Sequence, residues 1–132
     1  MAGVYATNLT REDIFEAIYS RRVFGTTDHR TILEFKVNDQ WMGSEIVSIN
    51  PPVISGMVIS HTPLMKVEIV KFDGNDYKIT PILAPSESKF FEFSIIDNLF
   101  TGSSFYYLRV VSKGNENNRY AWSSPVWVSK PQ

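Results

Sequence analysis

Apolar side chains alternate with polar ones in several short segments of this chain of 132 residues. In residues 31–37, Leu33 and Phe35 would share one face of an extended strand, while Glu34 and Lys36 would share the other. The same period of two recurs in residues 65–69 and 90–96. Because each such strand has an apolar face to bury, the pattern predicts sheets that pack against each other.

Turn residues divide these segments from one another. Residues 73–76, Asp-Gly-Asn-Asp, are the strongest hairpin signal, and Pro51 and Pro52 interrupt the chain before another strand. Gly56 inside that strand predicts a bulge, and Pro125 predicts an edge or a bend between sheets. About eight strands at a spacing of about 8 to 12 residues predict a mainly β, antiparallel two-sheet β-sandwich of immunoglobulin or fibronectin-like kind. A partly open barrel is the alternative.

One amphipathic helix is predicted before the strands. Thr10 is a suitable N-cap with Asp13 at the capping-box position, and Leu9 could pack onto Ile14. The helix should run from residue 11 to about residue 22, and Gly25 should follow it as a stop signal. We therefore divide the chain into residues 1–30, a helix and connection that would end an upstream catalytic domain, and residues 31–130, the sandwich.

The predicted helix has an apolar stripe formed by Ile14, Phe15, Ile18 and Tyr19. An apolar stripe of this kind is normally buried against another surface. We expect it to contact an upstream catalytic domain, or a second copy of the chain, through Ile14, Phe15 and Ile18.

Composition narrows the function classes. Hydrophobic residues make up 43% and charged residues 20%, so the chain should form a globular core. A net charge of −1 without a basic cluster argues against nucleic acid as a partner, and no apolar run approaches the roughly 18 residues that would span a membrane. The chain has no cysteine and no targeting signal at its start, which leaves the compartment open.

The connection after the helix holds one candidate binding cluster: Thr27, Asp28, His29 and Arg30. A carboxylate, an imidazole and a guanidinium close together could bind an anion or contribute one metal ligand. The simpler interpretation is that Asp28 and His29 cap backbone groups in the connection.

No complete catalytic site can be assembled from the sequence. The two histidines, His29 and His61, lie in different segments without partners at metal-ligand spacing, so we predict no metal site and no cofactor in this chain. A nucleophile elbow and a glycine-rich phosphate loop are both absent.

Aromatic residues offer a different kind of site. Flat aromatic rings stack on flat sugar rings, so exposed aromatic side chains could form a platform for carbohydrate. The alternative is that they belong to the core. The candidates are Trp41, Trp122 and Trp127, with Tyr106 and Tyr107.

Several segments together resemble the C-terminal region of an uncharacterised branch of PHP-type (polymerase and histidinol phosphatase-like) metal-dependent phosphoesterases. The similarity runs from about residue 7 to residue 128, and its strongest pieces are residues 9–18, 21–27, 42–43, 106–110 and 121–128. The resemblance implies a metal-binding catalytic barrel upstream and a β-sandwich at the C-terminal end. A divalent metal is thus implied only for a parent enzyme.

This sequence departs from the family pattern in two ways. It has no His-x-His pair, and adjacent Asp28 and His29 do not match a spaced Asp-x-His pair, so no metal ligand is carried over. Asp28 also stands where similar sequences often have glycine. If a parent enzyme places this connection near its active site, residues 27–30 would be the part of this chain closest to the chemistry.

The leading hypothesis is an accessory sandwich with a packing or scaffolding role, without catalysis of its own. The alternative is a carbohydrate- or ligand-binding module that uses its aromatic side chains.

Overall fold

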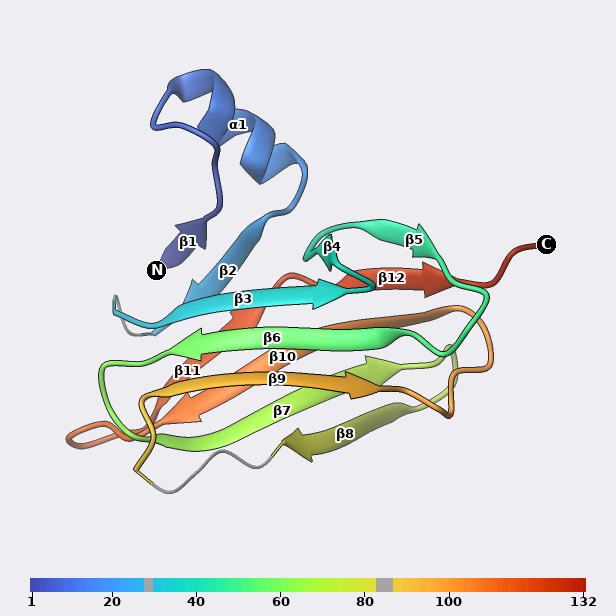
Figure 1. Cartoon of the computed structure of the whole chain (residues 1–132). Coiled ribbons are helices and arrows are strands. Elements are labelled where there is room, and N and C mark those ends of the chain that lie inside the picture. Colours follow the sequence, from blue (N-terminus) through green and yellow to red (C-terminus); the bar gives the residue numbers. More distant parts are fainter. Residues whose placement is uncertain (28–29, 83–86) are drawn as a thin grey trace.

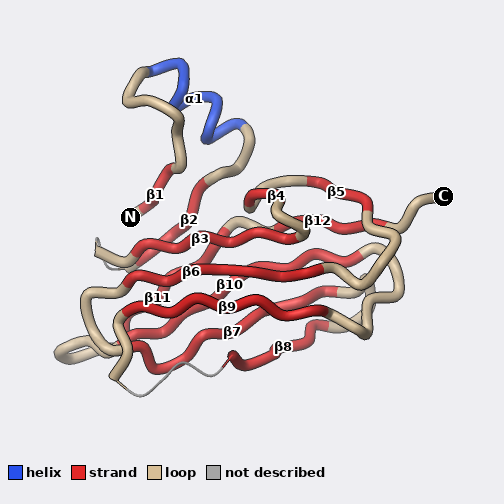
Figure 2. The backbone as a smooth tube through the Cα atoms, in the orientation of Figure 1, coloured by secondary structure: helices blue, strands red, loops and turns tan. Residues whose placement is uncertain are grey.

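The computed structural model describes residues 1–27, 30–82 and 87–132. The chain is mainly β with one short helix, and its strands form two sheets that lie face to face (Figures 1 and 2). The elements are β1 Ala2–Val4, α1 Arg11–Tyr19, β2 Val23–Thr26, β3 Ile32–Val37, β4 Gln40–Trp41, β5 Glu45–Val47, β6 Val53–Ile59, β7 Leu64–Phe72, β8 Tyr77–Ile82, β9 Phe90–Ile96, β10 Ser104–Ser112, β11 Arg119–Ser123 and β12 Val126–Ser129.

The larger sheet is built around β10. One edge of β10 pairs with β11 through residues 109–112 and with β12 through residues 104–106. Its other edge pairs with β7, which carries β8 beyond it. β1 and β2 extend the sheet beyond β11, and β5 extends it beyond β12. Pro125 therefore separates two strands of one sheet.

The strand pairing departs from an all-antiparallel arrangement at one place. β5 runs parallel to β12, whereas the other strand pairs of the described residues are antiparallel. The parallel pair arises because β4 and the following turn carry the chain from the smaller sheet to the edge of the larger one before β5 begins.

The smaller sheet has the order β4-β3-β6-β9. The bulge predicted at Gly56 is wrong, because β6 keeps an unbroken register with both β3 and β9. The glycine serves packing instead. A Cβ at residue 56 would lie 2.6 Å from the ring of Phe93, so only glycine leaves room for that ring over the strand.

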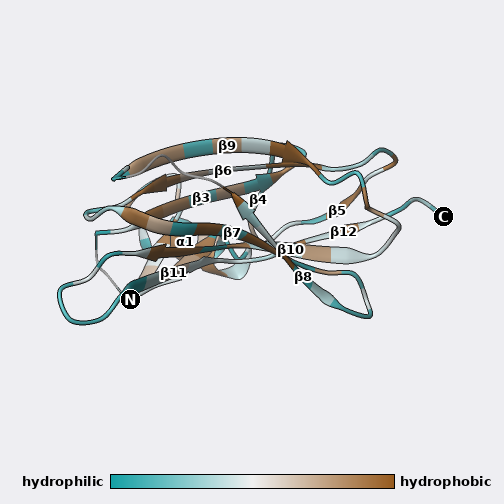
Figure 3. Cartoon of the chain, turned by 90° about the horizontal axis from the view of Figure 1, so that it is seen from below, coloured by the Kyte–Doolittle hydropathy of each residue, from teal (hydrophilic) through white to brown (hydrophobic). Residues whose placement is uncertain are grey.

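The core lies between the sheets (Figure 3). Leu33, Phe35 and Val37 point into it from β3, and Leu108 and Val110 point into it from β10; each of these side chains is at most 1% exposed. The apolar halves of the alternating segments are therefore the halves that the two sheets bury against each other.

A buried ionic cluster also joins the two layers. Lys71 in β7 donates to Asp97 just after β9, with 2.6 Å between Nζ and Oδ2, and the Tyr106 hydroxyl donates to the same oxygen at 2.6 Å. Burial alone would raise the pKa of the Asp97 carboxyl, but the hydrogen bonds from Lys71, from Tyr106 and from the Leu99 backbone lower it below its ordinary value.

Helix α1 begins as predicted and ends earlier. The Asp13 backbone N–H donates to Thr10 Oγ1 at 3.1 Å, which confirms the N-cap. At the other end Arg21 has φ of 63°, its N–H donates to the Ile18 carbonyl, and the next N–H donates to the Ala17 carbonyl. This left-handed closure ends the helix at Tyr19, not near residue 22.

Strands β1 and β2 were not predicted. Gly25, expected to stop the helix, lies inside β2 opposite Trp122 of β11. Strands β1 and β2 complete one side of the larger sheet, so part of residues 1–30 shares a sheet with the strands of residues 31–130. The assignment of residues 1–30 to the end of a catalytic domain stays a prediction.

Helix α1 stands away from the two sheets (Figure 1). Leu9 is 94% exposed, so the predicted packing of Leu9 onto Ile14 is wrong. The side chains of Phe15, Ile18 and Tyr19 are 68%, 53% and 78% exposed, and within the helix only Ala17 is buried. Of the predicted stripe, Ile14 is half-buried, and the sheets of this chain leave Phe15, Ile18 and Tyr19 uncovered.

Candidate functional site

The outer face of the larger sheet carries a row of aromatic side chains. Strand β10 turns Tyr106 and Leu108 into the core, and its alternation therefore turns Phe105 and Tyr107 outward. Phe105 lies opposite Trp127 of β12 on one side and opposite Phe72 of β7 on the other.

The same register continues across five strands. Trp127 is paired with Glu45 of β5, and Phe72 is paired with Tyr77 of β8. We call Trp127, Phe105, Phe72 and Tyr77 the aromatic row, and Glu45 closes one end of it. Three inter-strand steps of about 4.8 Å give a row about 14 Å long, and Glu45 lies one step beyond it.

The rings of the row contact one another at one end. The centroid of the Phe72 ring lies 4.7 Å from that of Tyr77 and 5.4 Å from that of Phe105. Tyr77 is 65% exposed, while Phe72, Phe105 and Trp127 are half-buried. The rings therefore support one another while part of each faces outward.

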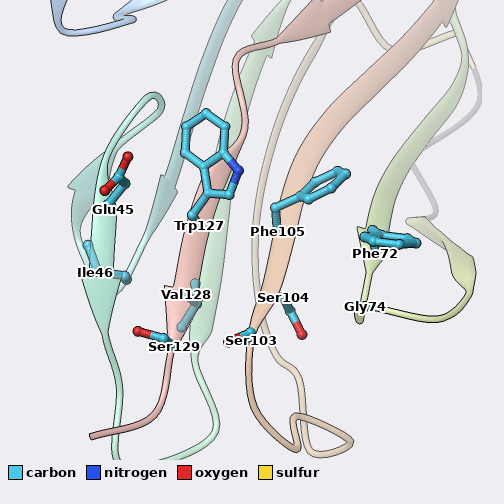
Figure 4. A pocket seen from close by; sticks show the side chains of 10 residues that line it. All are labelled: Glu45, Ile46, Phe72, Gly74, Ser103, Ser104, Phe105, Trp127, Val128 and Ser129. Atoms are coloured by element: carbon cyan, nitrogen blue, oxygen red, sulfur yellow. The ribbon is translucent and has the colours of Figure 1, made fainter.

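A hollow of about 410 Å³ lies along this row. Trp127, Phe105 and Phe72 project beside it from three neighbouring strands, as Figure 4 shows. Polar groups stand at its sides, and the ten lining residues are Glu45, Ile46, Phe72, Gly74, Ser103, Ser104, Phe105, Trp127, Val128 and Ser129.

Arg21 fixes the Trp127 end of the row. Its guanidinium carbon lies 5.0 Å from the centre of the Trp127 ring, Nε donates to the Gly43 carbonyl at 2.9 Å, and Nη2 lies 3.4 Å from Glu45 Oε1. The positive φ of Arg21 is unusual for a residue with a side chain, and these contacts hold it in place.

The three tryptophans that the sequence suggested as a platform do not lie together. Trp127 belongs to the aromatic row. Trp122 of β11 is on the same outer face, 39% exposed and stacked on Tyr120 with centroids 6.0 Å apart. Arg109 and Glu68, with N and O 3.2 Å apart, line a separate hollow with Trp122.

Trp41 belongs to the smaller sheet. Its ring packs 4.7 Å from the Tyr5 ring, with the Lys36 ammonium 4.6 Å above it. The Tyr5 hydroxyl donates to the Leu33 carbonyl, and burial together with the nearby charge of Glu34 raises the pKa of Tyr5 to about 12. Trp41 is thus part of the packing beside β1 and lies outside the aromatic row.

The two tyrosines suggested with them have opposite positions. Tyr106 is 1% exposed and binds Asp97 in the core, whereas Tyr107 lies on the outer face next to Phe105, with centroids 6.5 Å apart. The sequence interpretation missed Phe72, Tyr77 and Phe105. Extending the period of two through residues 104–112 would have placed Phe105 and Tyr107 on the face opposite Tyr106.

The cluster of residues 27–30 is only partly described, since Asp28 and His29 lie outside the described residues. Thr27 interacts with the start of β11, where its Oγ1 accepts from the Tyr120 N–H at 2.9 Å. Arg30 meets His61, with 3.2 Å between Nη1 and Nε2. The fold therefore places His61 next to Arg30, although the sequence interpretation did not include His61 in this cluster.

Residues 1–27, 30–82 and 87–132 contain no group of three or more acidic or histidine side chains arranged to hold a metal ion. Among the same residues, no helix has the length and apolar character that a membrane crossing requires.

This chain is similar to uncharacterized proteins of Chlamydia. It is 30% identical to one from Chlamydia trachomatis over 97% of its own length and 22% of that protein's length. Relatives from Chlamydia muridarum and Chlamydia pneumoniae show the same identity and coverage. No family model matches the chain, and no solved structure matches it.

The chain spans about a fifth of the length of these relatives. The aligned part takes in 97% of this chain, and the relatives are several times longer than the two-sheet unit. In a longer protein, two outward surfaces of this unit are candidates for contact with another part or with a ligand. They are the exposed side of α1 and the aromatic row.

Proposed function

We propose that this chain is an accessory β-sandwich of immunoglobulin or fibronectin-like kind, which packs against another part of a longer protein and has no catalysis of its own. The observation that supports this role is the uncovered apolar side of α1. Phe15 and Tyr19 stack with ring centroids 6.4 Å apart, and Ile18 lies exposed between them in the sequence.

The length of α1 makes a partner physically reasonable. A helix of nine residues is marginal by itself in water and depends on tertiary packing. Here that packing buries only Ala17 within the helix. Covering a large apolar side chain stabilises by about 1.5–3 kcal/mol, so burying Phe15, Ile18 and Tyr19 would hold α1 against a partner.

The resemblance described above leads us to propose a PHP-type metal-dependent phosphoesterase as the longer protein. In that case the partner of α1 is the catalytic part, which holds the divalent metal. The test is an assay of a full-length relative for metal-dependent hydrolysis of a phosphoester. A full-length relative without any such hydrolysis contradicts this part of the proposal and leaves the packing role of α1 open.

Hydrogen exchange tests the packing role directly. We expect the amides of α1 to exchange slowly in a full-length relative and much faster in this chain alone. In this chain, the double substitution of Phe15 and Ile18 by serine should leave the sheets intact but weaken association with the separately produced remainder of the protein. Ile49→Ser is the matched control, since Ile49 is also exposed, at 78%, but lies between β5 and β6. Equal exchange in both contexts would contradict the role.

A second candidate function is ligand binding by the aromatic face. The observation that favours it is that Trp127, Phe105 and Phe72 line a hollow and that each of these residues is only half-buried. Exchanging both Trp41 and Trp122 for phenylalanine leaves Trp127 as the only tryptophan of three. Acrylamide should then quench its fluorescence equally in the isolated chain and in the longer protein. Protection in the longer protein would mean that a neighbouring domain covers this face.

A further inference from the structure

We infer that the aromatic row binds a linear, neutral glycan, whose pyranose rings lie on Trp127, Phe105 and Phe72. This inference rests on the second candidate function and names its ligand class.

The shape of the row matches an extended ligand. The four aromatic side chains share one register and follow a line across four strands, with Glu45 on a fifth. The hollow lies beside three of them, Trp127, Phe105 and Phe72 (Figure 4). A small compact ligand would leave much of such a row uncovered, whereas a chain of flat rings can lie along it.

The chemistry of the row matches a sugar. A pyranose ring presents C–H groups on its faces, which pack on aromatic rings, and hydroxyl groups at its edges, which need hydrogen-bond partners. The aromatic side chains supply the apolar floor. Glu45, whose side chain is 73% exposed, can accept from hydroxyl groups, and Ser103 and Ser129 add hydroxyls among the lining residues.

The charge balance favours a neutral glycan. Arg21 and Glu45 lie 3.4 Å apart at the Trp127 end, so their charges offset each other. A strongly anionic or cationic ligand would meet no excess of opposite charge there.

The apolar surface beside the row is bounded by charge. Tyr107, Val70 and Ile79 form a second apolar line next to the row in the same register. One further step along β10 and β7, the charged pair of Arg109 and Glu68 lies on the same outer face.

The Trp127 ring is also held in one position. Arg21 lies over the ring and is itself fixed by the Gly43 carbonyl and by Glu45. A side chain that is already ordered loses less conformational entropy when a ligand binds.

The test uses the chain in which Trp127 is the sole tryptophan, with phenylalanine at positions 41 and 122. We would titrate it with linear hexasaccharides of β-1,4-linked glucose, of β-1,4-linked N-acetylglucosamine and of α-1,4-linked glucose, and screen the unmodified chain on a broad glycan array. We expect a saturable change in Trp127 emission with at least one neutral glycan. In calorimetry on the otherwise unmodified chain, Trp127→Ala and Phe105→Leu should each weaken that binding at least tenfold.

Trp122→Ala is the matched control, because it removes an exposed ring of the same sheet outside the row; it should change affinity by less than twofold. Circular dichroism and thermal unfolding establish that each variant is folded. Binding that survives Trp127→Ala in a folded variant would overturn the site. Absence of binding across the array and the three hexasaccharides would overturn the inference that the ligand is a glycan. If Trp127 is also shielded from acrylamide in the longer protein, the second candidate function fails as well; if it is not shielded, only the glycan fails.

Discussion

At the scale of single residues, Asp97 shows how a charge can be placed between two sheets. Its carboxylate receives the Lys71 ammonium and the Tyr106 hydroxyl, and the three side chains come from elements of both layers. The side chains of Lys71 and Asp97 are only 10% and 15% exposed. Removing one charge therefore leaves the other poorly solvated.

We expect Asp97→Asn to lower the free energy of unfolding by about 3 kcal/mol, because the Lys71 ammonium then stays buried without a counter-charge. Urea unfolding followed by circular dichroism measures the change. Glu92→Gln is the control, since Glu92 is exposed on β9 and should cost less than about 0.5 kcal/mol. A loss of similar size in both variants would show that the cluster has no special role.

Gly43 is the second residue at which the fold leaves little choice. Its φ is +93°, and a Cβ there would lie 2.4 Å from the Ser20 carbonyl oxygen at the end of α1. Gly74 has a similar φ of +97° but has open space around it. Comparing substitutions at these two glycines therefore separates the energetic cost of backbone strain from that of a steric clash.

We expect Gly43→Ala to destabilise the chain by roughly 2–4 kcal/mol and Gly74→Ala by about 1 kcal/mol, because only the first adds a clash with backbone to the strain. Thermal unfolding of the two variants measures the difference. Equal losses would mean that the chain shifts away from Gly43 without cost.

At the scale of elements, α1 illustrates a helix that local signals begin and tertiary contacts end. Thr10 caps it through a hydrogen bond to the Asp13 N–H three residues on. Arg21 ends it in a conformation that glycine usually takes, because its guanidinium binds Gly43 and Glu45 and packs on Trp127.

We expect Thr10→Ala to destabilise α1 by about 1 kcal/mol, since the Asp13 N–H then lacks its partner, while Thr10→Ser should retain the cap. Amide exchange in residues 11–19 should become about fivefold faster in the alanine variant. Because α1 contacts the sheets so little, the unfolding midpoint of the sheets should stay unchanged. A falling midpoint would show that α1 unfolds together with them.

At the scale of the whole molecule, the pH dependence of stability follows from carboxyls whose pKa is lowered by folding. Burial would raise the pKa of the Asp97 carboxyl, but its hydrogen bonds outweigh that effect and lower the pKa. The pKa of the Asp73 carboxyl is lowered by hydrogen bonds from the backbone N–H groups of Asp76 and Asn75. A group with a lowered pKa contributes stability above its unfolded pKa of about 3.9 and loses it as the pH falls through its folded pKa.

We therefore expect the free energy of unfolding to fall as the pH is lowered from about 5 to below about 3, with no comparable change between pH 5 and 7 from these groups. In Asp97→Asn the acid-induced loss should be smaller, because one of the titrating groups is gone. Urea unfolding at a series of pH values measures both curves. Parallel curves would mean that the carboxyl of Asp97 is protonated equally in the folded and unfolded chains.

The candidate site belongs to the whole molecule as well. Trp127 was predicted as a platform residue from its type alone, but Phe105, Phe72 and Tyr77 join it only because β12, β10, β7 and β8 meet in one register. Trp41 lies outside the aromatic row because β4 belongs to the other sheet. Cross-strand register depends on which strands pair, and no single segment of sequence contains that choice.

Local patterns thus determined the elements of this protein: Leu33, Phe35 and Val37 specify a strand by their period, Thr10 specifies a helix start, and residues 73–76 specify a turn. The tertiary structure decided what those elements became, from the strand through Gly25 to the parallel pairing of β5 and the left-handed turn at Arg21. The physical reason is the range of the interactions: side-chain alternation and capping act over a few neighbouring residues, whereas pairing and burial join residues that only the completed fold brings into contact.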